Sequence, residues 1–113
     1  MATAPFVQTG NAIDYTPDAD VSAGDVVVQN DLVGVVKLDI KADALGTLAV
    51  TGVFDFPKAT GVDTGIDAGL EVYWDEADQE AKTDDEAGAN KLIGKTVAAA
   101  GDDDETVRVR LSQ

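Results

Sequence analysis

GTLAVTGVFDFPKATG, residues 46–61, carries the strongest strand pattern in this chain of 113 residues. A period of two places alternate side chains on opposite faces of a sheet, so the stretch predicts one long strand that carries much of the core. Gly52 stands where an apolar side chain is due, which indicates a bulge or a close approach of another backbone. Pro57 has no N–H for a ladder, so the strand is expected to end there. The alternating apolar residues are Leu48, Val50, Phe54 and Phe56.

Shorter strand patterns lie on both sides of this stretch. Val26–Val28 is β-branched and predicts a buried strand, and Asn30-Asp31 indicates a hairpin into 32–38. Further strands are expected at 11–16, 70–74, 81–83, 92–98 and 106–112. Lys41–Leu45 is long enough for a single helical turn, and a helix over Glu76–Lys82 competes with the strand near 81–83, although it has no apolar stripe. The pattern predicts an all-β fold, a small antiparallel β-sandwich or barrel of jelly-roll type with at most one or two short helical turns.

The last strand has the cleanest alternation. Val107, Val109 and Leu111 are expected to face the core together with Leu48, Val50 and Phe54, and Arg108 and Arg110 are expected to face outward. These two residues are the only arginines of the chain. On so acidic a protein, two roles fit them: pairing with carboxylates of this or a neighbouring subunit, or simple surface exposure.

A faint internal repeat runs through the chain. Residues 21–24 (VSAG) match residues 66–69 (IDAG), and residues 32–34 (LVG) match residues 92–94 (LIG). Each copy ends in a strong alternating strand, and the second copy would carry an acidic insertion at about 75–90. Chance similarity and a structural duplication both explain the match at this stage.

Charge excludes several classes of function. The chain has 22 Asp and Glu against 8 Lys and Arg, a formal net charge of −14. Nucleic-acid backbones and anionic membranes would both repel it, so neither is expected as a partner. The acidic excess is mostly Asp, a composition similar to that of proteins from salt-loving archaea, in which molar salt screens the self-repulsion. An ordinary acidic protein from a mesophile is the alternative.

The chain offers little for catalysis or metal binding. It has no cysteine and no histidine, so zinc clusters, Cys–His pairs and Ser–His–Asp triads cannot form. Carboxylates are abundant, but their clusters lie in predicted turns, where solvated charges are the simplest interpretation and a specific calcium site is the alternative. Tyr73 and Trp74 are expected in the core or at an interface, and binding of a sugar is the other possibility. We predict no enzyme activity, no cofactor and no metal. The carboxylate clusters are Asp18/Asp20, Asp84–Glu86 and Asp102–Glu105.

Several stretches together resemble the small capsid cement, or head-decoration, proteins of tailed viruses and prophages. The run Gly52–Lys58, GVFDFPK, is the most specific of them. The others lie in the family's order along nearly the whole chain. They are Ala23–Val28, Leu32–Val35, Gly46–Thr51 with Ala59, Gly69–Asp75, Leu92–Gly94 and Thr106–Leu111.

The resemblance implies a compact β domain without catalytic residues that binds the outside of a capsid as a small symmetric oligomer. The implied partner is the major capsid protein, the implied homo-oligomer is a trimer or else a dimer, and the implied location is the outer surface of a virion assembled from protein made in the host cytoplasm. Combined with the Asp-rich composition, it indicates a tailed virus of a halophilic archaeon, with a bacterial prophage as the alternative. A polysaccharide-binding β module, or a carboxylate-dependent glycan hydrolase, is the alternative function.

The domain organisation follows from the same patterns. Residues 1–10 are expected to form an N-terminal arm or an edge strand, and residues 11–113 a single β domain with an acidic hairpin or insertion at about 75–90. Pro5, Phe6 and Val7 are apolar and lie next to the N-terminus, so they are candidates for contact with a capsid or a neighbouring subunit, as are Arg108 and Arg110.

Overall fold

The computed structural model describes residues 3–4 and 10–113. Within them the chain forms nine β-strands and one 3-10 turn. The first four strands are β1 (Ala12–Tyr15), β2 (Val26–Gln29), β3 (Leu32–Val36) and β4 (Gly46–Ala49). The others are β5 (Gly52–Pro57), β6 (Glu71–Asp75), β7 (Glu80–Lys82), β8 (Lys91–Thr96) and β9 (Thr106–Leu111), and the 3-10 turn η1 (Glu86–Gly88) lies between β7 and β8.

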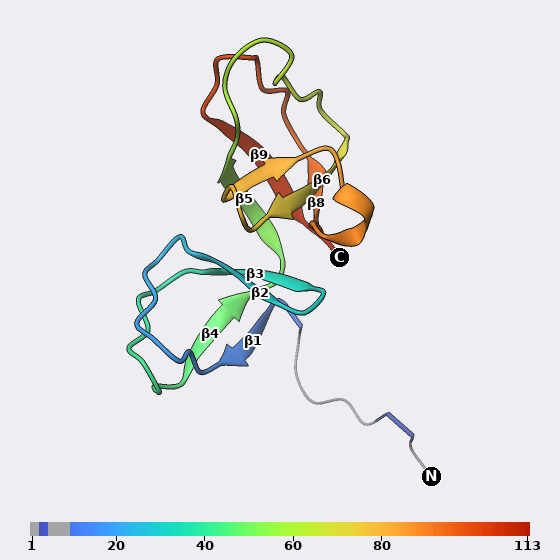
Figure 1. Ribbon diagram of the computed structural model, residues 1–113. Helices are drawn as coiled ribbons and strands as arrows, with labels where there is room; N and C mark the ends of the chain where they lie inside the picture. Colours follow the sequence, from blue (N-terminus) through green and yellow to red (C-terminus); the bar gives the residue numbers. More distant parts are fainter. Residues whose placement is uncertain (1–2, 5–9) are drawn as a thin grey trace.

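The strands form two antiparallel sheets, which confirms the all-β prediction. The order is β1-β4-β3-β2 in the first sheet and β5-β9-β8-β6-β7 in the second. Figure 1 shows the first sheet in the lower half of the molecule and the second in the upper half. The predicted strands at 70–74 and 81–83 are confirmed, because β6 and β7 pair as a hairpin with Trp74 opposite Ala81. No helix forms over Glu76–Lys82.

The long strand predicted across residues 46–57 is wrong in one respect. Gly52 has φ +114, a conformation that L side chains rarely adopt, and the chain crosses there from β4 in the first sheet to β5 in the second. The crossing leaves Val50 and Phe54 half-buried, whereas we expected both in the core. Leu48 is fully buried, and β5 ends at Pro57 as predicted.

One core joins the two sheets. Phe56 is its largest fully buried side chain, and it packs edge-on against Trp74, with ring centroids 6.0 Å apart. Val33 and Val35 of the first sheet belong to the same buried cluster as Val107, Val109 and Leu111 of the second. The three inward residues predicted for β9 are therefore confirmed. A smaller cluster of Val36, Ile40 and Leu48 lies under the first sheet alone.

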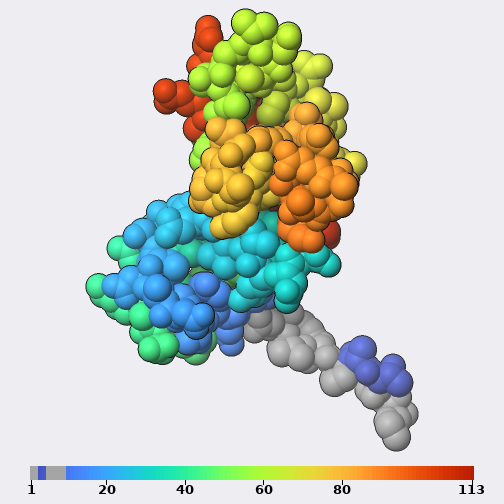
Figure 2. Space-filling view, viewed as in Figure 1, coloured from blue at the N-terminus to red at the C-terminus, as the bar shows by residue number. Residues whose placement is uncertain are grey.

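The internal repeat is confirmed as a structural one. If β1, β2, β3 and β4 are matched with β5, β6, β8 and β9, the two sheets have the same strand order. Gly34 lies opposite Val27, as Gly94 lies opposite Val72. Outside the strands, the isolated bridge between Val21 and Ile40 matches that between Ile66 and Ala100. In Figure 2 the first repeat fills the lower half of the surface and the second the upper half.

Two predictions about the first repeat need correction. The strand at Val26–Val28 is half-buried, because β2 lies at the edge of its sheet. Lys41–Leu45 forms a turn and not a helical one. The Ala44 N–H donates to the Lys41 carbonyl oxygen and closes the turn, but Asp43 has φ +63, outside the helical region, and its N–H donates to the Pro17 carbonyl oxygen.

Two polar contacts tie the repeats together. Lys91 in β8 forms an ion pair with Asp31 in the β2–β3 turn, with a nitrogen–oxygen distance of 2.8 Å. The Gln113 side-chain amide accepts from the Val33 N–H and donates to the Val33 carbonyl oxygen. β4 pairs with β3 only at Val35 and Val36, so the Gln113 amide bonds the backbone groups of Val33 that β4 does not reach.

Candidate functional site

The alternation of β9 builds the candidate interaction surface. Arg108 and Arg110 are exposed on the outer face of the second sheet, as predicted, because the residues between and beside them are buried in the core. The structure uses these two arginines differently.

Arg108 is paired within its own chain. It lies directly opposite Asp55 of β5, its Nε donates to Asp55 Oδ1 at 3.0 Å, and its Nη2 donates to Asp55 Oδ2 at 3.3 Å. This two-pronged bond lowers the pKa of the Asp55 carboxyl below its ordinary value. Of the roles considered for the arginines, Arg108 fulfils the pairing with a carboxylate of its own subunit.

Arg110 has a different environment. Its cross-strand neighbours are Val53 of β5 and Lys95 of β8, and Lys95 in turn lies opposite Glu71 of β6. In the part of the chain that the structure describes, neither Arg110 nor Lys95 has an ion pair. Like charges directly opposite each other on a sheet are destabilising, so the pair lowers the stability of the isolated chain.

We call the row Val53, Arg110, Lys95 and Glu71 the cationic row. Val53 is 54% exposed at one end of it. A hollow of about 100 Å³ lies among Glu71, Lys95 and Arg110. Two adjacent cations beside an exposed valine suit a carboxylate carried on an apolar surface. Sequence reasoning missed Lys95, because only the register between β8 and β9 brings it to Arg110.

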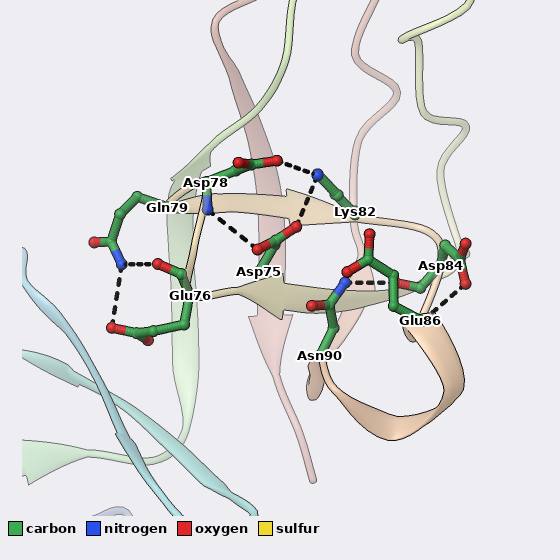
Figure 3. A network of polar contacts seen from close by, with 8 residues as sticks. All are labelled: Asp75, Glu76, Asp78, Gln79, Lys82, Asp84, Glu86 and Asn90. Carbon is green, nitrogen blue, oxygen red and sulfur yellow. Dashed lines mark hydrogen bonds and ion pairs between the residues drawn. The ribbon is translucent and has the colours of Figure 1, made fainter.

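A second polar group lies on the β6–β7 hairpin, in the segment whose conformation was ambiguous from sequence (Figure 3). Asp75 is buried, and its carboxylate accepts from Lys82 Nζ at 2.7 Å and from the Asp78 N–H at 3.1 Å. Lys82 also reaches the Asp78 carboxylate at 2.6 Å. These bonds lower the pKa of Asp75 and raise that of Lys82. The carboxylates therefore hold the hairpin together.

This hairpin gives a pH-dependent prediction. Because the folded-state pKa of Asp75 lies below its ordinary 3.8, its stabilisation is full above that value and is lost as the pH falls through the lowered pKa. Asp75→Asn should lower the melting temperature at neutral pH and flatten its fall below about pH 4. Calorimetry across pH tests this, with the exposed Asp103→Asn as the control. An equally steep acid loss in Asp75→Asn would contradict it.

Comparison with known families identifies the chain. The phage cement protein family matches residues 7–111. The chain belongs to the phage cement protein family. No curated protein and no solved structure matches the cement protein. Family membership gives it a structural, capsid-stabilising role, capsid proteins as partners and a place in the virion.

The aromatic pair of the cement protein is used for packing. Trp74 is 3% exposed, and its Nε1–H donates to Glu76 Oε2 at 2.9 Å. Such a ring has no free face for a sugar, so the core role expected for Trp74 is confirmed. Tyr73 is half-buried beside Lys82. Nothing in these positions supports the polysaccharide-binding alternative.

Carboxylates of the acidic turns of the cement protein accept hydrogen bonds from backbone N–H groups, either of the same turn or of another loop. Asp20 accepts from the Ala42 N–H, Asp84 from the Glu86 N–H and Asp102 from the Gly65 N–H, at 2.8, 2.9 and 2.7 Å. Among residues 3–4 and 10–113, no group of three or more acidic side chains is placed to hold a metal ion. Over the same residues, no helix is long and apolar enough to cross a membrane. Pro5, Phe6 and Val7 lie outside the described residues.

Proposed function

We propose that this cement protein binds the outside of an assembled capsid and holds neighbouring major capsid subunits together. The family match over residues 7–111 carries the proposal, because it covers nearly the whole chain. The net charge of −14 supports the outer side, since the inner side of a filled capsid faces nucleic acid, which would repel the protein.

The cationic row is the proposed contact with a neighbouring subunit. Arg110 and Lys95 are two of only eight basic residues, and a neighbouring copy of the chain presents many carboxylates to them. A cationic face that receives an acidic face of the next copy is a heterologous contact, which closes into a ring when the rotation allows it. A homotrimer is the ring that we favour, and a dimer is the other outcome. Arg108, bonded to Asp55, borders this contact.

The N-terminal segment is the proposed second contact. Pro5, Phe6 and Val7 form an arm that lies on the capsid or on a neighbouring copy, with Phe6 as its anchor. Proline reduces the entropy lost when such an arm becomes ordered. The arm precedes β1, which forms one edge of the first sheet.

The host is the remaining part of the proposal. The chain has 17 Asp and 5 Glu against 8 basic residues, a composition that suits a tailed virus of a salt-loving archaeon. The protein would be made in the host cytoplasm. In such a virus, both the melting temperature and capsid attachment should rise from dilute buffer to molar salt.

The function is tested with capsid shells that lack the cement protein. Purified protein should co-sediment with them to a saturating occupancy and raise their resistance to heat. Arg110→Gln should weaken assembly of the oligomer, measured by light scattering, because one of the two cations is lost. Thr60→Glu is the matched control, since it makes the same change in net charge at an exposed loop position.

Deletion of residues 1–8 tests the arm in the same assay. A folded truncated protein that no longer attaches would support the arm as a binding element, and one that attaches at full level would contradict it. If the full-length protein binds shells neither at low salt nor at molar salt, the proposed function itself is overturned.

A further inference from the structure

The segment that joins β3 to β4 presents two large apolar side chains to solvent. Leu38 is 78% exposed and Leu45 is 72% exposed. Both line one surface groove of about 410 Å³, together with Ile40 and Ala44. We call this segment, residues 37–45, the apolar tip. Adjacent exposed leucines that flank a groove mark contact sites more often than isolated surface residues do.

The second repeat shows that the fold does not require these leucines. The equivalent connection, from β8 to β9, spans residues 97–105. It continues from the matching bridge residue, Ala100, into four consecutive acidic residues, Asp102–Glu105. The same connection therefore carries exposed leucines in the first repeat and a run of acidic residues in the second. In Figure 1 the two connections lie at opposite ends of the molecule.

The apolar tip is held in place by backbone contacts. Ile40 exchanges two hydrogen bonds with Val21, both at 2.9 Å, and is buried. The Asp43 N–H donates to the Pro17 carbonyl oxygen at 2.8 Å, and the Asp39 carboxylate accepts from the Ala23 N–H. The leucines therefore stand on an ordered loop, and a partner would not have to order it on binding.

Charge also separates the two ends. The apolar tip has no net formal charge, because two exposed cations, Lys37 and Lys41, are balanced by two exposed carboxylates, Asp39 and Asp43. Lys41 also lies 3.7 Å from the Asp20 carboxylate. At the opposite end, Lys58 is buried and donates to the carbonyl oxygens of Ala59 and Asp104, so one buried cation stands against the four exposed acidic residues of the turn, Asp102–Glu105. The apolar tip can approach another protein closely, whereas the acidic end repels an acidic surface and stays hydrated.

We infer that the apolar tip is the end that seats on the major capsid protein, with Leu38 and Leu45 in an apolar depression of its outer surface and the acidic end directed to solvent. The inference rests on the proposed function. Two leucines and a small groove fall well short of the roughly 800 Å² per partner of a stable pairwise complex. An oligomer that applies several tips to an ordered lattice gains the missing affinity through multivalency, so a capsid suits this surface better than a second copy does.

The test compares two serine variants on cement-free shells. The double variant Leu38→Ser/Leu45→Ser should melt as the wild type does, because both side chains are mostly exposed, and it should bind shells at least about tenfold more weakly. Val62→Ser is the matched control, since Val62 is 86% exposed in the second repeat, and it should bind as the wild type does.

A second measurement does not depend on how well the double variant folds. The chain has no cysteine, so Leu45→Cys and Val62→Cys each give a single attachment point for a thiol-reactive photocrosslinker. Crosslinks to the major capsid protein from position 45 and none from position 62 would support the inference.

The outcomes separate the inference from the proposed function. Wild-type protein that binds shells, with a double variant that binds equally well, would overturn the inference alone. A double variant with a changed oligomeric state, or crosslinks from position 45 only to other copies, would assign the apolar tip to copy–copy contact and also overturn it. Wild-type protein that binds no shells would overturn the proposed function.

Discussion

Phe56→Ala is expected to lower the free energy of unfolding by about 3–5 kcal/mol, the usual cost of truncating a buried phenylalanine. Phe56 is 1% exposed and contacts two other rings edge-on, Trp74 at 6.0 Å and Phe54 at 6.5 Å. Its loss would open a cavity in the cluster that joins the two sheets, lined by buried valines and by Trp74. Urea titration followed by tryptophan fluorescence measures the change, because Trp74 is the only tryptophan.

Phe54→Ala is the matched control, two residues away on the same strand and the same face. Phe54 is only half-buried, so its truncation should cost about 1–2 kcal/mol, since less apolar surface returns to water. Equal losses in the two variants would contradict the assignment of Phe56 to the centre of the core. A larger loss for Phe54 would mean that β5 is shifted by two residues.

The alternation in residues 46–57 correctly identified extended backbone but could not identify the sheet. Period two reports only that neighbouring side chains point to opposite faces. Whether Leu48 and Phe56 share a sheet depends on the backbone at Gly52, where φ is +114 and the chain changes partners. The sequence indicated that the strand pattern is interrupted at Gly52. It could not show that the chain crosses to another sheet there, because a bulge gives the same local pattern.

The cationic row, which is a candidate interaction surface, shows the same limit. β9 is a central strand with one buried face, so its alternation placed Arg108 and Arg110 on the outer face from sequence alone. Lys95 and Asp55 lie beside them through pairings between residues far apart in the chain. The sequence therefore predicted the face on which the arginines lie, and the register decides which arginine is paired.

The repeat was visible in the sequence through residues with a strict backbone role. Gly24 and Gly69 close the two short matches with φ +95 and +83, and the N–H of each donates to the third strand of its sheet, at Val36 and Thr96. Other positions were free to diverge, as the two strand connections did. The two glycines therefore match because the backbone there adopts a positive φ that L side chains rarely adopt, although the space around each is open.

Gly34 and Gly94 are the second pair of matching glycines, and they differ in what surrounds them. A methyl group on Gly34 would overlap the buried side chain of Leu48, which would have to shift, and would come within 3.0 Å of the Ala49 carbonyl oxygen. A methyl group on Gly94 would overlap the carbonyl oxygen of Arg110 and come within 2.8 Å of the Ser112 nitrogen, both backbone atoms of the paired strand. The clash of an added methyl group at Gly94 can therefore be relieved only if β8 and β9 separate.

Gly94→Ala is accordingly expected to destabilise the protein by about 3 kcal/mol or more, at or beyond the upper end of the usual cost of overpacking, and Gly34→Ala by about 1–3 kcal/mol. Because the strained pairing lies beside Lys95 and Arg110, Gly94→Ala should also weaken the proposed oligomer at protein concentrations where the fold persists. Gly101→Ala is the control: the nearest atom to its added methyl is 3.7 Å away, so its stability should be unchanged or slightly higher. Denaturant titration ranks the three variants. A Gly94→Ala protein as stable as Gly101→Ala would show that β8 and β9 are not paired in this register, and the cationic row would then lose its geometric basis.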